Sequence, residues 1–124
     1  MLNSIRGDDR SVKILGVTSF DLFVPGLNFV FGLADPVQGV AILSLIRLVA
    51  VGEEEKMIRL IGERIYKEAV HEIGHLFQLT HCPDQKCIMT FANSIWDVDA
   101  KLPRLCPSCN RQLQQLLENR VRIR

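Results

Sequence analysis

The feature that most constrains this chain is the stretch HEIGHLFQLTHC at residues 71–82, which places three histidines, a glutamate and a cysteine within twelve positions. Residues four apart share one face of a helix, with Cβ atoms about 5–6 Å apart, so His71 and His75 can present imidazole nitrogens to one ion. His81 lies too far along the chain to share that face. It can complete the set only if the helix ends near Gln78 and the chain turns back. The spacing therefore predicts a zinc site built from three histidines at the end of a helix.

Glu72 follows the first histidine directly. In H-E-x-x-H sites a glutamate at this position does not bind the metal but takes the proton from a water that the metal activates. Three neutral imidazoles leave zinc its +2 charge and an open position for that water. A lone histidine is more often a core or surface residue, but three at this spacing together with Glu72 indicate a hydrolase.

The residues before this stretch predict the helix that carries it. Apolar side chains recur at intervals of three and four from residue 57 to residue 69, and the acidic residues 53–55 suit the positive end of a helix dipole. Earlier in the chain, residues 12–17 and 40–46 are typical of β-strands, separated by turn-rich segments. After residue 82 the pattern becomes irregular, and a short closing helix is expected from Arg111 onward. The fold class predicted is therefore α/β, with an irregular C-terminal half.

Four cysteines follow the histidines, at positions Cys82, Cys87, Cys106 and Cys109. Two closely spaced pairs are typical of a closed structural zinc site, which would hold together a loop-rich half that has little core of its own. Two disulfides or free buried thiols are the alternatives. If Cys82 binds a different ion from its neighbour His81, it fixes the third histidine in space.

Composition bounds the remaining possibilities. With 124 residues the chain is expected to form a single domain, residues 1–124. Its 15 basic residues against 14 acidic ones give no bias toward a nucleic-acid or membrane partner. The charged opening residues do not resemble a secretory signal, and the apolar region 29–51 is interrupted by Asp35 and Arg47, too early for a membrane span. We therefore expect a cytoplasmic protein, whose reduced thiols favour zinc over disulfides.

Taken together, these motifs resemble the archaemetzincins, whose signature joins H-E-x-x-H-x-x-G-x-x-H-C to C-x-M and C-x-x-C. The corresponding stretches here are HEIGHLFQLTHC, CIM at 87–89 and CPSC at 106–109, and the resemblance runs from about Lys13 to the final helix. It implies a catalytic zinc on the three histidines, with Glu72 as proton acceptor, and a second, structural zinc on the four cysteines. It also implies that Met89 belongs to the turn beneath the catalytic metal.

The resemblance implies a metzincin-like zincin fold, in which a mixed, twisted sheet lies beside the long active-site helix. An edge strand would border the cleft, where a peptide would bind as an added strand, and VAILS at residues 40–44 is the candidate. Gln78 stands where the motif has glycine, so we expect a cost of about 1 kcal/mol for a left-handed turn, or a different turn. The family usually has a further strand and helix before the first segment, so the N-terminal part is expected to be truncated or minimal.

The function predicted is a zinc-dependent metallopeptidase with two zinc ions per chain, Glu72 as general base and a peptide or protein as substrate. Some zinc-dependent endoribonucleases also use H-x3-H-x5-H, but Glu72, the four cysteines and the balanced charge speak against that class. A catalytically inactive, zinc-stabilised binding domain is the other alternative.

Overall fold

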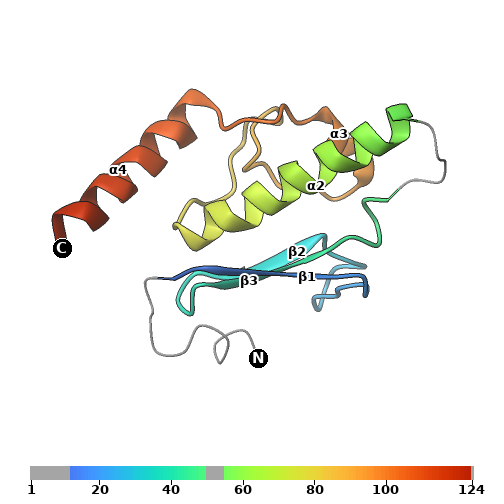
Figure 1. Cartoon of the computed structure of the whole chain (residues 1–124), viewed down its shortest axis with the longest axis horizontal. Coiled ribbons are helices and arrows are strands. Elements are labelled where there is room, and N and C mark those ends of the chain that lie inside the picture. The colour runs from blue at the N-terminus through green and yellow to red at the C-terminus, as the bar shows by residue number, and fades with distance from the viewer. Residues whose placement is uncertain (1–11, 50–54, 124) are drawn as a thin grey trace.

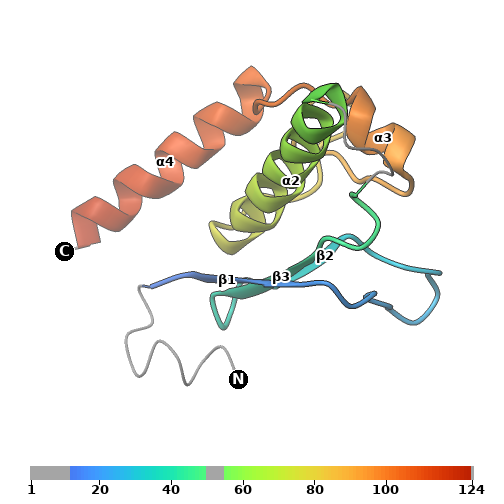
Figure 2. The same ribbon diagram turned by 45° about the vertical axis from the view of Figure 1, so that its right-hand side comes forward.

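A computed structural model describes residues 12–49 and 55–123, with side chains as far as Asn119. The elements are the strands β1 (Ile14–Thr18), β2 (Gly32–Asp35) and β3 (Val40–Ser44) and the helices α2 (Glu55–Leu76), α3 (Ile95–Ala100) and α4 (Pro107–Ile123). Figure 1 shows α2 lying across one face of the sheet, with α3 beside its first half, and Figure 2 shows α4 on the other side of α2 from α3. Two of the acidic residues expected to start the helix, Glu53 and Glu54, lie outside the described residues.

The sheet has the strand order β1-β3-β2, with β1 parallel to β3 and β2 antiparallel to it. The expected α/β class and the mixed sheet are confirmed. The choice of residues 40–44 as the edge strand was wrong, because β3 pairs on both sides and is the central strand. The edge strand nearest the active-site helix is β2, which the sequence did not indicate because GLAD is short and carries no β-branched residue.

A tight turn joins β2 to β3 and sets their register. The carboxylate of Asp35 accepts hydrogen bonds from the backbone N–H groups of Val37 and Gln38, each at 3.1 Å. Gly39 then adopts a φ of 71°, which glycine allows without strain. The turn places Asp35 opposite Val40 and brings Gly32 opposite Leu43. β2 therefore forms because this turn folds it back onto β3.

Helix α2 packs on the sheet with an apolar face and buries a polar stripe on another side. The stripe consists of residues spaced at three and four, which is one face of a helix: Arg64, Lys67, Glu68, His71 and Glu72. The helix ends in a turn that satisfies its last carbonyls, since Gln78 N–H donates to His75 O at 2.9 Å and Leu79 N–H to Gly74 O at 3.0 Å. Gln78 has a φ of 77°, so glutamine takes the left-handed position that glycine usually fills.

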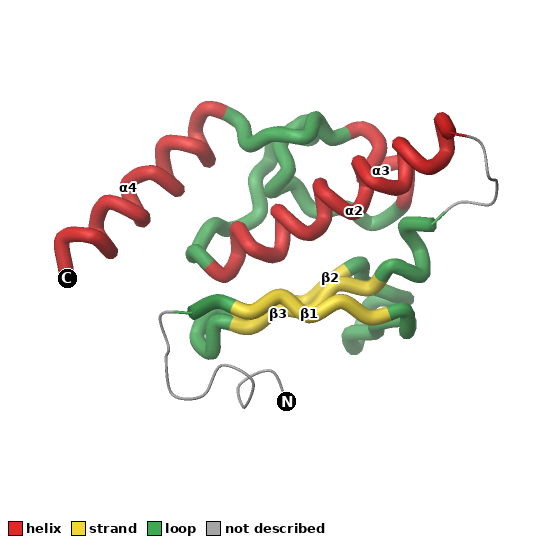
Figure 3. The backbone as a smooth tube through the Cα atoms, viewed as in Figure 1, coloured by secondary structure: helices red, strands yellow, loops and turns green. Residues whose placement is uncertain are grey.

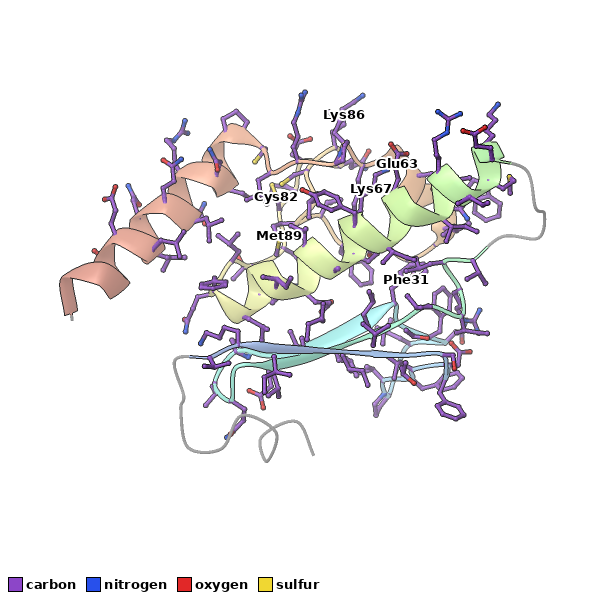
Figure 4. All side chains as sticks on the ribbon, in the orientation of Figure 1. Phe31, Glu63, Lys67, Cys82, Lys86 and Met89 are labelled. Carbon is purple, nitrogen blue, oxygen red and sulfur yellow. The ribbon has the colours of Figure 1, made fainter. Side chains whose placement is uncertain are left out.

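Two apolar clusters hold the elements together. Phe31, Leu43, Leu48 and Val98 form one of them, and Figure 4 shows Phe31 between the sheet and α2. The other packs Leu79, Cys87, Ile88, Met89 and Cys109 against the start of α4. Because α2 contributes partly buried side chains to both clusters, it joins the two halves of the described structure.

The C-terminal half differs from expectation in two respects. Figure 3 shows loop between α2 and α4, interrupted by α3, which is too short for a periodic pattern in the sequence to indicate it. The closing helix α4 begins at Pro107, four residues before Arg111, because proline suits the first turn of a helix.

Candidate metal centre

The three histidines meet at the end of α2. His71 and His75 project from the last turns of the helix, and the left-handed residue Gln78 reverses the chain so that His81 faces them. One ring nitrogen from each histidine lies within 4.8 Å of the others, and the ring centroids are 4.7–5.4 Å apart. The structure thus brings together the three residues that the sequence assigned to one site, and the predicted turn near Gln78 is confirmed.

Backbone carbonyls determine which nitrogens face the centre. Nδ1 of His71 lies 2.7 Å from the carbonyl oxygen of Ile88, and Nδ1 of His75 lies 2.8 Å from that of Leu79. A carbonyl oxygen can only accept a hydrogen bond, so each Nδ1 carries the proton and each Nε2 keeps its lone pair. The two Nε2 atoms lie only 3.1 Å apart. Two lone pairs that point into the same space need a cation between them.

A proton does not meet that need at His71. Burial, followed by the charge of Lys101, lowers the pKa of His71 to about 3. Burial and the neighbouring His75 also lower the pKa of His81. At neutral pH these two rings are neutral, which is the form in which imidazole binds a metal ion. The donor set therefore fits Zn²⁺, which favours histidine nitrogen.

Glu72 is buried beside this centre with one oxygen lacking a partner. Its side chain packs against β2, where the space at Gly32 is so narrow that a Cβ would lie 2.8 Å from Cγ of Glu72. Oε2 of Glu72 is buried with no hydrogen-bond partner among the described residues. Burial, with the charge of Glu68 as the next cause, raises the pKa of Glu72 to about 8. An unsatisfied buried carboxylate oxygen is costly unless a water or a ligand reaches it, so the site is built to receive one.

A cleft of about 590 Å³ opens over the centre. Its floor includes His71, Glu72 and His75, and one wall is the edge strand β2 with the segment before it. Phe91, whose ring lies 5.4 Å from that of His81, also lines the cleft. The described lining is mostly apolar apart from Glu68, Glu72, Gln78, Thr80 and the histidines, so the cleft can take an apolar group beside the metal centre.

Met89, which the resemblance places in a turn beneath the catalytic metal, packs against α2 at Gly74. It is fully buried, and a Cβ added at Gly74 would lie 2.5 Å from its Sδ. Gly74 therefore gives Met89 room to pack against α2, which accounts for a glycine inside a helix. The backbone of Met89 accepts a hydrogen bond from Cys82 N–H at 2.9 Å. Figure 4 shows Met89 and Cys82 on the side of α2 away from the sheet.

The four cysteines form a second cluster next to the histidines. Their Sγ atoms lie within 4.8 Å of one another, and none of the four forms a disulfide. The disulfide alternative is therefore not what the structure shows. Four thiols at this separation match the donor set of a closed zinc site. Because Cys82 follows His81, one peptide unit links the two clusters.

Sequence reasoning missed two residues of this region, Lys101 and Glu68. Both are buried, and the Nζ atom of Lys101 lies 2.9 Å from Oε2 of Glu68 and 3.0 Å from the carbonyl oxygen of Ile88. Glu68 shares the helix face of His71 and Glu72, a spacing that could have indicated it. Lys101 had no such signal, because its partner is 33 residues away in the chain.

Comparison with known proteins agrees with this geometry. The sequence model of Peptidase family M54 matches residues 1–115. The archaemetzincin of Pyrococcus furiosus is 48% identical over 117 residues, which cover 94% of this chain and 61% of that protein. This chain belongs to the archaemetzincin family. The chain spans about three fifths of the length of such Pyrococcus archaemetzincins.

Solved archaemetzincin structures share the fold. The crystal structure from Methanopyrus kandleri matches with a TM-score of 0.78 at 44% identity, covering 86% of this chain and 56% of that one. The archaemetzincin from Archaeoglobus fulgidus, solved as a complex with malonate, matches with a TM-score of 0.70 at 44% identity, covering 81% of this chain and 60% of that one. Across residues 12–49 and 55–123, no helix has both the length and the apolar character needed to cross a membrane.

Proposed function

We propose that this chain carries the active site of a zinc-dependent peptidase. The observation that supports it most is the pair of Nε2 lone pairs of His71 and His75, held 3.1 Å apart by backbone carbonyls and faced by His81. These three residues would hold a zinc ion, which supplies Lewis acidity toward the scissile carbonyl and toward water. The four cysteines would hold a second zinc ion with a structural role. Such a thiolate set suits a reducing compartment, so a cytoplasmic location is part of the proposal.

Glu72 is the general base in this proposal. Glu72 lines the cleft and its Oε2 has no partner among the described residues, so this oxygen is available to a water molecule. A zinc ion on the histidines would lower the pKa of Glu72 from about 8 and favour the ionised form that a base requires. The carboxylate accepts a proton from the attacking water and delivers it to the leaving amine. Burial against Gly32 keeps the carboxylate in one place between the two transfers.

The edge strand β2 offers a place for the substrate. It borders the cleft, and one side of it has no strand partner among the described residues. An extended peptide can add to such an edge through backbone hydrogen bonds, which would lay its carbonyls across the histidine centre. Membership of a peptidase family favours this substrate over the RNA considered as an alternative.

The test compares wild type with Glu72→Gln and His81→Ala on quenched fluorescent peptides, casein and RNA. Glutamine keeps the shape of Glu72 but cannot accept the proton, so we expect hydrolysis of peptides to fall at least 100-fold with the zinc content unchanged. His81→Ala is expected to lose both activity and one of two zinc ions per chain. Peptide cleavage that survives Glu72→Gln, or cleavage of RNA alone, would contradict the proposal.

A further inference from the structure

A buried ion pair lies beside the histidines, and neither of its groups binds the metal or transfers a proton in the chemistry proposed above. The side chain of Lys101 is completely buried and that of Glu68 is 5% exposed, with Nζ and Oε2 2.9 Å apart. Lysine is almost never fully buried unless it is paired. Removing two charges from water costs several kcal/mol per ion, and apolar side chains of similar volume often stabilise a protein as well or better. Stability alone therefore does not account for this pair.

The lysine shares its second acceptor with a candidate metal ligand. The carbonyl oxygen of Ile88 accepts from Nζ of Lys101 at 3.0 Å and from Nδ1 of His71 at 2.7 Å. A carbonyl oxygen has two lone pairs, and both are used here. The N–H of Ile88 donates to Arg104 O at 3.1 Å, which ties the same peptide segment to the chain that follows Lys101.

Helix α3 delivers Lys101 to this position. Lys101 follows the last residue of α3, and its backbone N–H donates to Val98 O. The end of α3 is held against α2 by Lys67, whose Nζ donates to Val98 O at 3.2 Å. Arg64 holds it as well, through two hydrogen bonds of 2.8 and 2.7 Å to the carboxylate of Asp99. The end of α3 is therefore held against α2 at several points, so that loss of the Lys67 contact alone leaves Lys101 in place.

We propose that Lys101, held by Glu68, is a positioning residue for His71: it fixes the Ile88 carbonyl that sets the proton position and the orientation of the His71 ring. This inference rests on the metal site proposed above. A metal-bound histidine is commonly oriented by an acceptor at its other nitrogen, and loss of such an acceptor typically weakens metal binding 10- to 100-fold. Here the acceptor is the Ile88 carbonyl oxygen, and Nζ of Lys101 holds that oxygen in place through a second hydrogen bond.

The double variant Glu68→Met plus Lys101→Met tests whether the ion pair positions His71 or only stabilises the fold. Two methionines fill the volume with apolar atoms, so the thermal midpoint is expected to stay near that of wild type. The affinity of the histidine site for zinc is expected to fall about 10-fold or more. With zinc on the cysteines and cobalt on the histidines, the cobalt absorption bands are expected to shift, and the Nδ1–H signal of His71 in NMR spectra is expected to weaken.

Lys67→Met is the matched control. Lys67 is also buried and donates to the end of α3, but Ile88 O is not among the acceptors of its ammonium group. It is expected to lower the thermal midpoint while zinc affinity stays within about twofold of wild type. Wild-type zinc affinity and cobalt spectrum in the double variant would overturn the proposal. Equal weakening of zinc binding by Lys67→Met would overturn it too.

If the double variant does not fold, Glu68→Gln replaces it. Glutamine keeps an oxygen that can accept from Lys101 but removes the opposing charge, so a smaller loss of zinc affinity, about threefold, is expected; an unchanged affinity would overturn the proposal. All these measurements are made without a substrate. A wild type that binds two metal ions but cleaves no peptide would therefore refute the peptidase function and leave the role of Lys101 to be decided by metal affinity.

Discussion

At the scale of single residues, the position of Glu72 depends on a glycine in the facing strand. In Gly32→Ala the new Cβ would lie 2.8 and 2.9 Å from side-chain carbons of Glu72 and 2.9 Å from the carbonyl oxygen of Ile42. Real Cβ atoms do not approach so closely, so either β2 or Glu72, the proposed general base, must move. Because a 1 Å misplacement can cost about 100-fold in rate, we expect peptide hydrolysis to fall at least 10-fold. Steady-state kinetics on a quenched fluorescent peptide measures this.

Gly62→Ala is the control for that substitution. A Cβ at Gly62 meets nothing within 4 Å, and the residue lies within α2. Alanine there is expected to raise stability by about 0.5–1 kcal/mol with activity unchanged. Equal activity in the two alanine variants would show that Glu72 does not depend on the space at Gly32.

The raised pKa of Glu72 also predicts a dependence of stability on pH. In protein whose histidine site has been stripped of metal, the folded state has a pKa of about 8 against 4.5 for the ordinary carboxyl. Between these values the folded state holds a proton that the unfolded state releases, so the free energy of unfolding falls as pH rises, by at most about 1.4 kcal/mol per pH unit. Because other groups also titrate in this range, the measured quantity is the difference between the two proteins: in chemical denaturation from pH 5 to 8 the free energy of unfolding of wild type should fall relative to that of Glu72→Gln with this slope.

Metal in the histidine site provides the control for this titration. A nearby cation favours the charged carboxylate, so zinc loading should flatten the difference between wild type and Glu72→Gln. Parallel curves for the two stripped proteins over this range would mean that Glu72 titrates normally.

Gln78 is a residue at which the chain tolerates strain. Its φ of 77° lies in the region that favours glycine, and its place at the helix end is the one that glycine commonly fills. Gln78→Gly should therefore raise the free energy of unfolding by about 0.5–1 kcal/mol, because the left-handed conformation costs a residue with a Cβ about 1–2 kcal/mol and glycine gives back part of that in entropy. Thermal unfolding checks this. A lower midpoint would indicate that the glutamine side chain makes a compensating contact.

At the scale of elements, the sequence predicted best what is long or locally patterned. Helix α2 was predicted because its apolar residues repeat over many turns. The three histidines were predicted to meet because their spacing fits a helix face followed by a turn. Strand β2 was not found, because its four residues form a strand only through pairing with β3. Helix α3 has six residues, too few for a periodic pattern to be recognised. The roles of Lys101 and Gly32 depend on partners far away in the chain, which no local pattern reports.

The ion pair between Arg64 of α2 and Asp99 of α3 gives a further testable prediction. Arg64 is nearly buried and forms a two-point contact with Asp99, whose pKa this guanidinium lowers. Asp99→Asn leaves that charge without its partner and should lower the free energy of unfolding by about 1–2 kcal/mol at pH 7. The pKa of Asp99 is depressed on folding, so the stabilisation is present above the ordinary value of 3.8 and is lost as pH falls through the folded value.

Asp21→Asn is the control, since Asp21 pairs with Arg47 in the same two-point manner but at a more exposed place. Asp21→Asn is expected to lower the free energy of unfolding by less than Asp99→Asn, because water screens an exposed ion pair. Urea unfolding of both variants gives the comparison. A larger loss of stability in Asp21→Asn than in Asp99→Asn would show that the ion pair between α2 and α3 is not the more stabilising of the two.

At the scale of the whole molecule, we expect metal binding by the histidines to depend on the cysteine cluster, and not the reverse. Cys82 ties the turn that bears His81 to the cysteine cluster, whereas His71 and His75 stand on helix α2. Cys109→Ser should therefore reduce zinc binding at both clusters, and His81→Ala only at the histidines. Zinc content per chain by mass spectrometry, with circular dichroism to follow folding, checks this asymmetry. A Cys109→Ser protein that keeps full affinity at the histidines would show that the clusters are independent.

The shortness of the edge strand β2 has one further consequence. An open strand can pair with the same strand of another molecule, and such pairing is a route to fibres and aggregates. In this chain β2 offers only four residues, Gly32–Asp35, before Pro36 ends it, and proline carries no N–H to extend the pairing. A strand of this length is long enough to hold a few residues of a guest chain and too short to template a growing stack, so the molecule keeps an open edge at little risk of self-assembly.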